Sequence, residues 1–578
     1  MYRIATIYLL CLILTTSTMA KSKKISIKII ETSDVHGYFF PFDFIEQSNT
    51  KGSMARISSY VKRERDKYGK NLILIDNGDI LQGQPACYYY NYIATSETNI
   101  AAQISNYMGY DIQVPGNHDI ETGHNVYDKW INELNCSVIG ANIIRTDTKQ
   151  PYVSPYKIII RDGIRIAVLG MLTPAIPNWL NESLWNGMTF ESIKTSADKW
   201  IRHLKEVEKA DIVIGLFHSG WNGGISTLHY NEDETESVAT DICGFDLIFF
   251  GHDHTRRIEN VTNKNGQKVV CIDPSCNALM VGEANIDIEI GNNNQIISKK
   301  IEGNIHDISN ENIDTEFIST FQSQIDKIRD YVKTPIGFLT DTIRTRDCFF
   351  GSAPFTDLIH NLQLQITGAD VSFNAPLSFN IEVASGPIRM SDMFKLYRYE
   401  NQIYVLNMSG KEIRNHLEMS YDLWVNTMTG PDDHIMLLDD KSTKDMQRYG
   451  FKNLTFNFDS AAGIDYIVDV SKPNGYKVKI IKMSNGEPFD ENKIYKVVMN
   501  SYRGNGGGEL LTRGAGISKS TLPERIIYQS EKDQRYYLTK EIERIKIIHP
   551  KANCNWHFVP EEWVKPAIER DRKLLSGN

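Results

Sequence analysis

Five short apolar stretches in the first half of the chain are each followed by side chains that can bind metal ions. These side chains are Asp34 with His36, Asp79, Asn117 with His118, His218, and His252 with His254. A glycine lies close to each group, which lets the main chain turn sharply and approach a ligand. Because polar groups cost solvation free energy when they are buried without use, their repetition predicts one shared site.

The candidate ligands offer carboxylate or amide oxygen and imidazole nitrogen, without thiolate. They are Asp34, His36, Asp79, Asn117, His218, His252 and His254. This donor set favours zinc, manganese, iron or cobalt over calcium or magnesium. Seven ligands are too many for one tetrahedral ion, but they divide evenly between two divalent ions if one carboxylate bridges. Two ions roughly 3.5 to 4 Å apart promote in-line phosphoryl displacement, so we predict hydrolysis of a phosphate ester.

His118 follows a candidate ligand directly but has no metal assigned to it. It is therefore free to protonate the departing oxygen or to stabilise charge on the phosphoryl group. Taken singly, these motifs also have ordinary interpretations: Asp79 could start a turn, and His218 could be a buried histidine bonded to a main-chain carbonyl. Their joint occurrence after five apolar stretches favours the catalytic interpretation.

The apolar stretches themselves are typical of buried strands. Candidate strands are residues 25–30, 71–75, 112–115, 164–169, 212–217 and 247–250, and they alternate with longer amphipathic stretches. This alternation predicts βαβ units and a covered parallel sheet. Since the carboxyl ends of parallel strands share one edge of a sheet, the five polar groups are expected to converge on one crevice.

With 578 residues, the chain is long enough for two or three domains. Apolar residues recur at helical spacing over residues 310–334, which predicts one long helix that ends before Pro335. The sequence beyond it mixes helical and strand patterns. The predicted division is 1–20 signal peptide, 21–305 metal domain, 306–335 linking helix, 336–540 substrate domain and 541–578 C-terminal tail.

Composition excludes some partners and indicates a compartment. The formal net charge is −9 and no long basic run occurs, so long nucleic acid is not an expected partner. Residues 4–14 form an apolar core too short to span a membrane, followed by small residues up to Ala20. This pattern predicts a signal peptide and a secreted, periplasmic protein; an N-terminal anchor helix is the alternative. No later segment is predicted to span a membrane.

Seven cysteines lie beyond the predicted signal peptide, and no Cys-x-x-Cys motif is present. A zinc-thiolate site is therefore not expected. Cys271 and Cys276 could form a disulfide in an oxidising compartment, or both could be buried thiols.

Five motifs carry a resemblance to a known family. Asp34-Val35-His36, Gly78-Asp79, Gly116-Asn117-His118-Asp119, His218-Ser219-Gly220 and Gly251-His252-Asp253-His254 resemble the five blocks of the calcineurin-like metallophosphoesterases. Over residues 25–530 the chain is similar to the secreted 5′-nucleotidase group, closest to its 2′,3′-cyclic-nucleotide 2′-phosphodiesterase/3′-nucleotidase branch. The resemblance implies a four-layer α/β/β/α metal domain and a C-terminal α+β substrate domain, joined by a long helix.

The resemblance also implies roles for single residues. One metal ion would bind Asp34, His36, Asp79 and His254, and the other would bind Asp79, Asn117, His218 and His252. His118 would be the catalytic histidine, with Glu121 as its acidic partner. Tyr399 and Tyr502 lie in segments that resemble those placing aromatic rings on the two faces of the nucleobase, although tyrosines packed in a core are the alternative.

The substrate prediction is a small nucleotide. The chain departs from the 5′-nucleotidase pattern at Ser372-Phe373-Asn374-Ala375-Pro376, where that branch has an asparagine and a glycine run followed by arginine. This favours 2′,3′-cyclic nucleotides and 3′-nucleotides over 5′-monophosphates. A 5′-nucleotidase or UDP-sugar hydrolase is the alternative enzyme, and a non-catalytic surface protein that binds nucleotides is the alternative of another class. Arg344, Arg346 and Arg503 could contact a phosphate or be solvated. The sequence predicts no oligomeric state.

Overall fold

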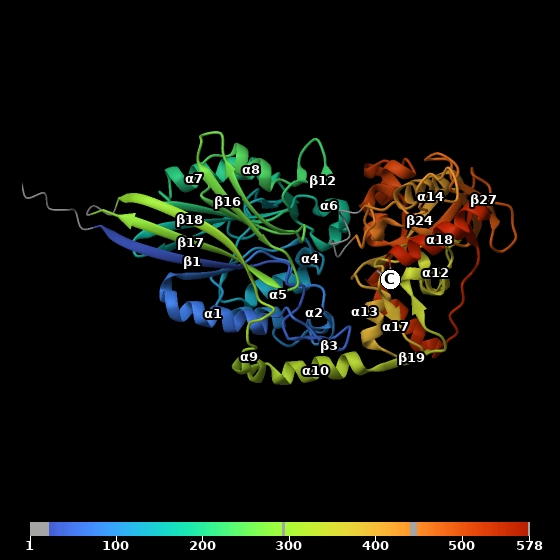
Figure 1. Cartoon of the computed structure of the whole chain (residues 1–578), viewed down its shortest axis with the longest axis horizontal. Coiled ribbons are helices and arrows are strands. Elements are labelled where there is room, and N and C mark those ends of the chain that lie inside the picture. The colour runs from blue at the N-terminus through green and yellow to red at the C-terminus, as the bar shows by residue number, and fades with distance from the viewer. Residues whose placement is uncertain (1–21, 292–294, 440–447, 576–578) are drawn as a thin grey trace, which may run out of the picture.

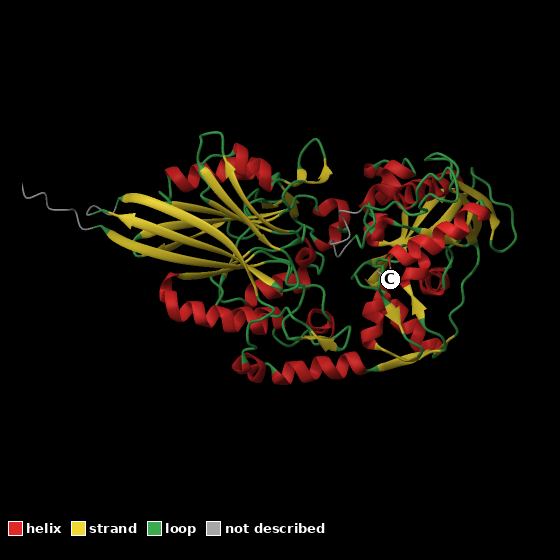
Figure 2. Cartoon of the chain, viewed as in Figure 1, coloured by secondary structure: helices red, strands yellow, loops and turns green. Residues whose placement is uncertain are grey.

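A computed structural model shows a chain with two lobes, joined along one side by a helix (Figure 1). The structure describes residues 22–291, 295–439 and 448–575. The predicted signal peptide, residues 1–20, lies outside these ranges. Strands fill the centre of each lobe and helices lie on the outside (Figure 2).

The N-terminal lobe contains two six-stranded sheets. The first has the order β18 (Ile296–Asp307), β17 (Met280–Ile290), β1 (Lys23–Thr32), β4 (Leu72–Asp76), β5 (Ile112–Gln113), β6 (Ser137–Val138). The second has the order β15 (Arg256–Thr262), β16 (Lys268–Pro274), β14 (Leu247–Phe250), β11 (Ile212–His218), β9 (Ile164–Leu172), β8 (Tyr156–Arg161). Strands β1, β4, β5 and β6 are parallel to one another, as are β9, β11, β14 and β16.

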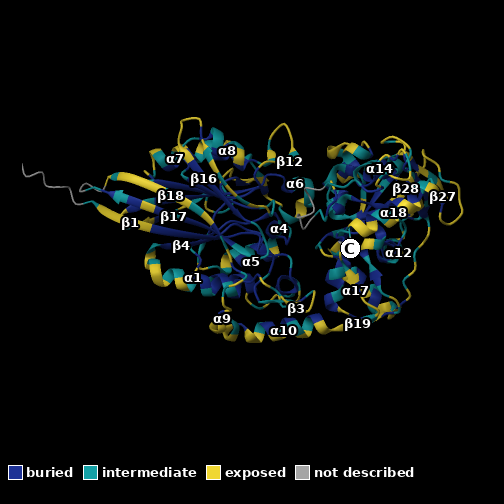
Figure 3. Ribbon diagram, in the orientation of Figure 1, coloured by how far each residue is buried: buried dark blue, intermediate teal, exposed yellow. Residues whose placement is uncertain are grey.

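The two sheets pack face to face around a shared apolar core. Alternate residues of β1, such as Ile25, Ile27 and Ile29, lie in this core together with Ile214 and Leu216 of β11. Their contact buries the centre of the lobe (Figure 3). The sequence argument from strand patterns expected one edge of one sheet, whereas the strands belong to two. The four-layer α/β/β/α arrangement that the resemblance implied is confirmed.

Helices cover the outer face of each sheet. The first sheet is covered by α1 (Met54–Tyr68), α3 (Ile100–Met108) and α5 (His124–Glu133), and the second by α7 (Ile193–Glu206) and α8 (Thr235–Asp241). Helix α1 begins where the Ser53 hydroxyl accepts the N–H of Arg56, a common N-cap.

The connection between the lobes differs in detail from the predicted single helix. Strand β18 continues to Asp307, and helical structure begins only at α9 (Thr315–Thr320), where the Asp314 carboxylate accepts the N–H groups of Glu316 and Phe317. Non-helical dihedral angles at Phe321 then separate α9 from α10 (Gln322–Lys333). The prediction of one unbroken helix was therefore wrong.

The C-terminal lobe is built around a five-stranded sheet. Its order is β25 (Ser460–Ala462), β21 (Val371–Asn374), β28 (Ile494–Asn500), β24 (Gln402–Ser409), β29 (Ile526–Asp533). The surrounding helices are α12 (Pro354–Thr367), α13 (Met390–Leu396), α14 (Gly410–Trp424) and α17 (Gln534–Ile545). This mixture is the α+β architecture expected from the sequence.

The last residues of the chain are part of this lobe rather than a separate tail. Strand β30 (Ile547–Ile548) pairs with β19 (Pro335–Leu339), and β31 (Trp556–Val559) pairs with β26 (Ile464–Asp469), which also pairs with β27 (Val478–Met483). Helix α18 (Glu561–Leu575) buries Val564 and Ala567 in the core of the lobe. The expected boundary at residue 540 is therefore not a boundary in the structure.

Within the described ranges, no helix has the length and apolar character to cross a membrane. All seven cysteines of the described residues carry free thiols, so Cys271 and Cys276 do not form the disulfide that the sequence left open.

Candidate metal centre

The carboxyl ends of strands from both sheets meet at the end of the N-terminal lobe that faces the C-terminal lobe (Figure 1). Asp34 and His36 follow β1, Asp79 follows β4, and Asn117 begins a short helix, α4 (Asn117–Ile120), after β5. From the second sheet, His218 is the last residue of β11, and His252 and His254 follow β14. The structure thus brings all seven predicted ligands to one region.

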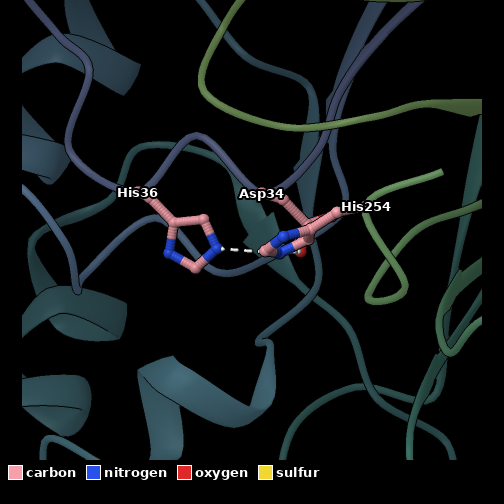
Figure 4. Close-up of side chains that lie close together, drawn as sticks. All are labelled: Asp34, His36 and His254. Atoms are coloured by element: carbon pink, nitrogen blue, oxygen red, sulfur yellow. Dashed lines mark hydrogen bonds and ion pairs between the residues drawn. The ribbon is translucent and has the colours of Figure 1, made fainter. Parts of the chain in front are cut away.

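Asp34, His36 and His254 form the first group of candidate ligands. One donor atom from each lies within 4.8 Å of the others. The Nε2 atoms of His36 and His254 are 3.1 Å apart and face each other (Figure 4). The Oδ1 atom of Asp34 lies 3.3 Å from Nε2 of His254. A metal ion needs several donor atoms that can reach one point, and these three donor atoms are close enough to do so.

Asp34, Asp79 and His218 form a second group with the same spacing. The Oδ2 atom of Asp79 lies 3.3 Å from Nε2 of His218 and 4.0 Å from Nε2 of His36. One carboxylate oxygen therefore lies between the two groups. The Oδ1 atom of Asn117 is 3.0 Å from Nε2 of His218, so the amide also reaches this group.

His252 lies beside the second group but has a different partner. Its ring centroid is 5.3 Å from that of His218, while its Nε2 atom is 3.1 Å from Oε1 of Glu232. Glu232, Asp233 and His252 form a third cluster of possible ligands. Sequence reasoning missed Glu232 because it lies in a polar hairpin, β12 (Gly223–Ser226) and β13 (Asn231–Asp233), whose approach to the site no local pattern reveals.

Five predicted ligands adopt left-handed backbone conformations. The φ angles are 51° for Asp34, 47° for His36, 56° for Asp79, 79° for His252 and 57° for His254. Residues with a Cβ atom rarely adopt this conformation, which costs of order 1 to 3 kcal/mol each and persists where the surrounding structure enforces it. This concentration of strained residues at one place is typical of a functional site.

The buried carboxylate of Asp119 holds the two ligand loops together. Its oxygens accept the main-chain N–H groups of Asp79, Ile80, Leu81 and Gly116 at 2.7 to 3.0 Å. Position 116 must be a glycine because Asp79 lies against its main chain: a Cβ atom there would lie 2.1 Å from Oδ1 of Asp79. No role was predicted for Asp119 from the sequence, although it belongs to the Gly116-Asn117-His118-Asp119 motif.

Two carboxylates of this site stay ionised and one imidazole stays neutral. Burial opposes ionisation of Asp34, but the hydrogen bond with His254 and the nearby His218 outweigh it and lower the pKa of this carboxyl. The pKa of Asp79 is likewise lowered, because His218 and His118 outweigh burial. Burial and the neighbouring His254 lower the pKa of His36 to about 3, which keeps this imidazole neutral and able to bind metal. The residues present therefore fit a pair of divalent ions.

His118 lies against the ligand cluster without belonging to it. Its ring centroid is 5.5 Å from that of His36, and its Nδ1 atom is 2.6 Å from Oε2 of Glu121. Burial lowers the pKa of His118, but Asp79 and Glu121 outweigh it and raise this pKa to about 9. The imidazole thus has a proton available, and Glu121 occupies the position that the resemblance implied.

The two predicted stacking tyrosines approach this site from the C-terminal lobe. The ring of Tyr399 lies 6.5 Å from that of His118, with the planes 8° apart. Tyr502, in α15 (Ser501–Gly504), lies within electrostatic range of Tyr399 and of Glu232. Both tyrosines are therefore close to the candidate metal centre.

The arginines predicted as possible phosphate contacts have other partners. Arg503 is buried and forms an ion pair with Asp459 at 2.8 Å, and Arg344 pairs with Glu382 at 2.6 Å. No hydrogen bond or ion pair of the Arg346 side chain lies within the described ranges; its side chain lines a surface cavity with Phe350.

Comparison with protein families matches both lobes. The calcineurin-like phosphoesterase family matches residues 27–256. The 5′-nucleotidase C-terminal domain family matches residues 335–513. The chain combines a calcineurin-like phosphoesterase domain with a 5′-nucleotidase C-terminal domain. It is a metal-dependent phosphoric ester hydrolase, in agreement with the sequence prediction.

Similar proteins span nearly the whole chain. A 2′,3′-cyclic-nucleotide 2′-phosphodiesterase/3′-nucleotidase of Salmonella typhimurium is 26% identical and covers 93% of this chain and 89% of its own length. A protein of the same name from Haemophilus influenzae is 25% identical and covers 94% of this chain and 89% of its own length. A provisionally assigned 5′-nucleotidase structure from Staphylococcus aureus has a TM-score of 0.77 and 21% identity, covering 92% of this chain and 99% of that chain. At this identity, the last match shows a common fold.

Proposed function

We propose that this enzyme hydrolyses 2′,3′-cyclic nucleotides to 3′-nucleotides, and 3′-nucleotides to nucleosides and phosphate. The observation that carries the proposal is the position of Asp79 Oδ2, between two groups of candidate ligands and beside a histidine with a raised pKa. The 3′ preference is supported by the names of the two bacterial relatives and by the departure from the 5′-nucleotidase pattern at residues 372–376.

The proposed division of the metal ligands is the one that the resemblance implies. One ion would be held by Asp34, His36, Asp79 and His254, and the other by Asp79, Asn117, His218 and His252. The clusters Asp34–His36–His254 and Asp34–Asp79–His218, and the contact of Asn117 with His218, support it. Two such ions supply charge that stabilises the phosphoryl group and lowers the pKa of a water molecule. The metal identity is left open by this donor set.

His118 is proposed as the general acid. In the first reaction, a water oxygen forms a bond to phosphorus while the bond from phosphorus to O2′ breaks, and O2′ takes up a proton. In the second reaction, the bond to O3′ breaks in the same way. Because Glu121 engages Nδ1 of His118, Nε2 is the nitrogen left to donate this proton.

Tyr399 and Tyr502 are proposed to hold the nucleobase between them. Both rings come from the C-terminal lobe and lie within electrostatic range of each other, close to His118 on one side and Glu232 on the other. Stacking on aromatic rings accepts any base because every base has a π face, so we expect little base selectivity.

The decisive experiment compares substrates with purified protein. Values of kcat/KM are measured for 2′,3′-cyclic AMP, 3′-AMP and 5′-AMP in the presence of added zinc, manganese or cobalt. We expect the first two to be turned over at least 10-fold more efficiently than 5′-AMP. Preference for 5′-AMP would overturn the proposal and support a 5′-nucleotidase instead.

A secreted, periplasmic location is proposed from the N-terminal sequence alone. Residues 4–14 are apolar and are followed by small residues up to Ala20. Sequencing the N-terminus of the protein after expression with its leader should find Lys21 as the first residue. A retained Met1 would contradict cleavage.

A further inference from the structure

Arg398 is an exposed arginine at the junction of the two lobes. It lies in the loop between α13 and β24, directly before Tyr399, and its guanidinium carbon is 5.9 Å from the centre of the Tyr399 ring. Its charge is within electrostatic range of Tyr38 and Cys276 from the N-terminal lobe. Cys276 in turn is within electrostatic range of the candidate ligand His254. Arg398 therefore belongs to the C-terminal lobe and lies close to residues of the metal domain.

The loop that carries Arg398 is held firmly in place. The buried side chain of Arg535 donates to the main-chain oxygens of Tyr397 and Arg398, at 2.9 and 2.7 Å, and pairs with Glu400 at 2.9 Å. Tyr397 is itself buried. The main chain is therefore fixed on both sides of Arg398. The position from which its side chain extends is defined by these contacts and not by the side chain itself.

Across residues 22–291, 295–439 and 448–575, no carboxylate forms an ion pair with the side chain of Arg398, whereas Arg503, Arg535 and Arg344 each have such a partner. An unpaired guanidinium beside a ring that lies 6.5 Å from His118 is available to an anion bound at the candidate metal centre. Planar guanidinium groups bind phosphate oxygens with two parallel hydrogen bonds.

We propose that Arg398 binds the phosphate of the substrate and favours phosphomonoesters over cyclic phosphodiesters. This inference rests on the proposed function, since it places the scissile phosphate at the metal centre. A cyclic phosphodiester carries one negative charge, whereas a phosphomonoester carries close to two at pH 7 and above. A single additional cation therefore stabilises the bound monoester more than the bound diester. Arg398 is then a specificity-determining residue for the second of the two hydrolytic reactions.

The test compares Arg398→Met and Arg398→Lys with the wild type. For Arg398→Met we expect kcat/KM for 3′-AMP to fall at least 10-fold, kcat/KM for 2′,3′-cyclic AMP to fall at most 3-fold, and the inhibition constant of inorganic phosphate to rise at least 10-fold. Arg398→Lys keeps the charge and should recover part of the 3′-AMP activity. The matched control is Arg414→Met, which removes an arginine of α14 that pairs with Glu491, and it should change none of these values.

Inhibition by adenosine separates phosphate binding from a disturbed loop. Adenosine carries a base but no phosphate, so its inhibition constant should stay within 2-fold in Arg398→Met. An equal rise for adenosine and phosphate, or equal losses on the two substrates, would overturn the assignment. If the wild type does not hydrolyse these nucleotides, the proposed function is wrong. Phosphate binding by Arg398 can then still be tested with p-nitrophenyl phosphate as substrate, by comparing the inhibition constant of phosphate in the wild type and in Arg398→Met.

Discussion

The Nδ1 atom of His118 lies 2.6 Å from Oε2 of Glu121, one helical turn further along the chain. Glu121 follows α4 directly, and its side chain is largely buried. This contact fixes the ring orientation of His118 and determines which nitrogen carries a proton toward the substrate.

Replacing either member of the pair should slow turnover without removing metal. We expect His118→Ala to lower kcat by about 10²- to 10⁴-fold, which is the usual contribution of a general acid. Glu121→Gln should lower kcat by about 10-fold, because the ring keeps a weaker hydrogen bond. His124→Ala removes a histidine that contacts Asp128 and should leave kcat unchanged. Steady-state kinetics and metal analysis check this; near-normal activity of His118→Ala would exclude it as the acid.

Asp79 should be required for both metal ions. Its Oδ2 atom lies 3.3 Å from Nε2 of His218 and 4.0 Å from Nε2 of His36, so Asp79→Ala removes a proposed ligand of both ions. We expect this variant to retain less than one ion per chain, whereas His36→Ala should lose mainly one. Elemental analysis of protein purified without chelator measures both. Two ions retained by Asp79→Ala would contradict a shared carboxylate.

Asp119 should matter for stability as well as for activity. Its carboxylate accepts four main-chain N–H groups in the loops that carry Asp79 and Gly116. Asp119→Ala leaves these buried donors without a partner, at a cost of about 1 to 3 kcal/mol for each group that water cannot reach. We expect a clear fall in melting temperature and weaker metal binding. The exposed Asp147→Ala is the matched control, and equal melting temperatures for the two variants would exclude this role.

The sequence was sufficient to locate the candidate ligands because each lies at the end of an apolar strand. Such strands are recognisable locally, and side chains that can bind metal ions follow five of them. Which sheet each strand joins is not local information: β4 and β11 have equally apolar sequences but belong to different sheets. For the same reason, Glu232 was not predicted, because it reaches His252 from a hairpin with no apolar pattern.

The end of the chain shows a second limit. Strand β30 has two residues and β31 has four, which is too short for the alternation of buried and exposed positions to be recognised. Their identity as strands depends on pairing with β19 and β26, which are far away in the sequence. The sequence therefore predicted a tail where the structure has an integrated part of the C-terminal lobe.

The two tyrosines should contribute to nucleotide affinity but not to phosphate affinity. We expect Tyr399→Ala and Tyr502→Ala each to raise KM for 2′,3′-cyclic AMP by roughly 5- to 100-fold, since stacking on one ring contributes about 1 to 3 kcal/mol. The inhibition constant of inorganic phosphate should not change. Tyr476→Ala removes a tyrosine that is 76% exposed and serves as control. If KM is unchanged in both Tyr399→Ala and Tyr502→Ala, these tyrosines do not stack on the base and only pack within the protein.

A buried histidine in the C-terminal lobe should make stability sensitive to acid. His360 is fully buried on α12, with Nδ1 2.8 Å from the Ser372 hydroxyl and Nε2 3.2 Å from the Ser460 hydroxyl. Burial lowers its pKa to about 3 in the folded protein. Below pH 6.5 the unfolded chain binds a proton that the folded chain does not, so stability falls as pH decreases from 6.5 toward 3. The expected loss from this group at pH 5 is about 2 kcal/mol.

Urea unfolding of the full chain at pH 7 and pH 5 measures this effect. His360→Gln removes the titrating group, so the difference in unfolding free energy between the two pH values should shrink by about 2 kcal/mol for the transition of the C-terminal lobe. His557→Gln, at an exposed position of β31, should leave the difference unchanged. Because the comparison uses the difference between two pH values, it is independent of any stability that His360→Gln loses at both. Equal differences in wild type and His360→Gln would show that this histidine is protonated while folded.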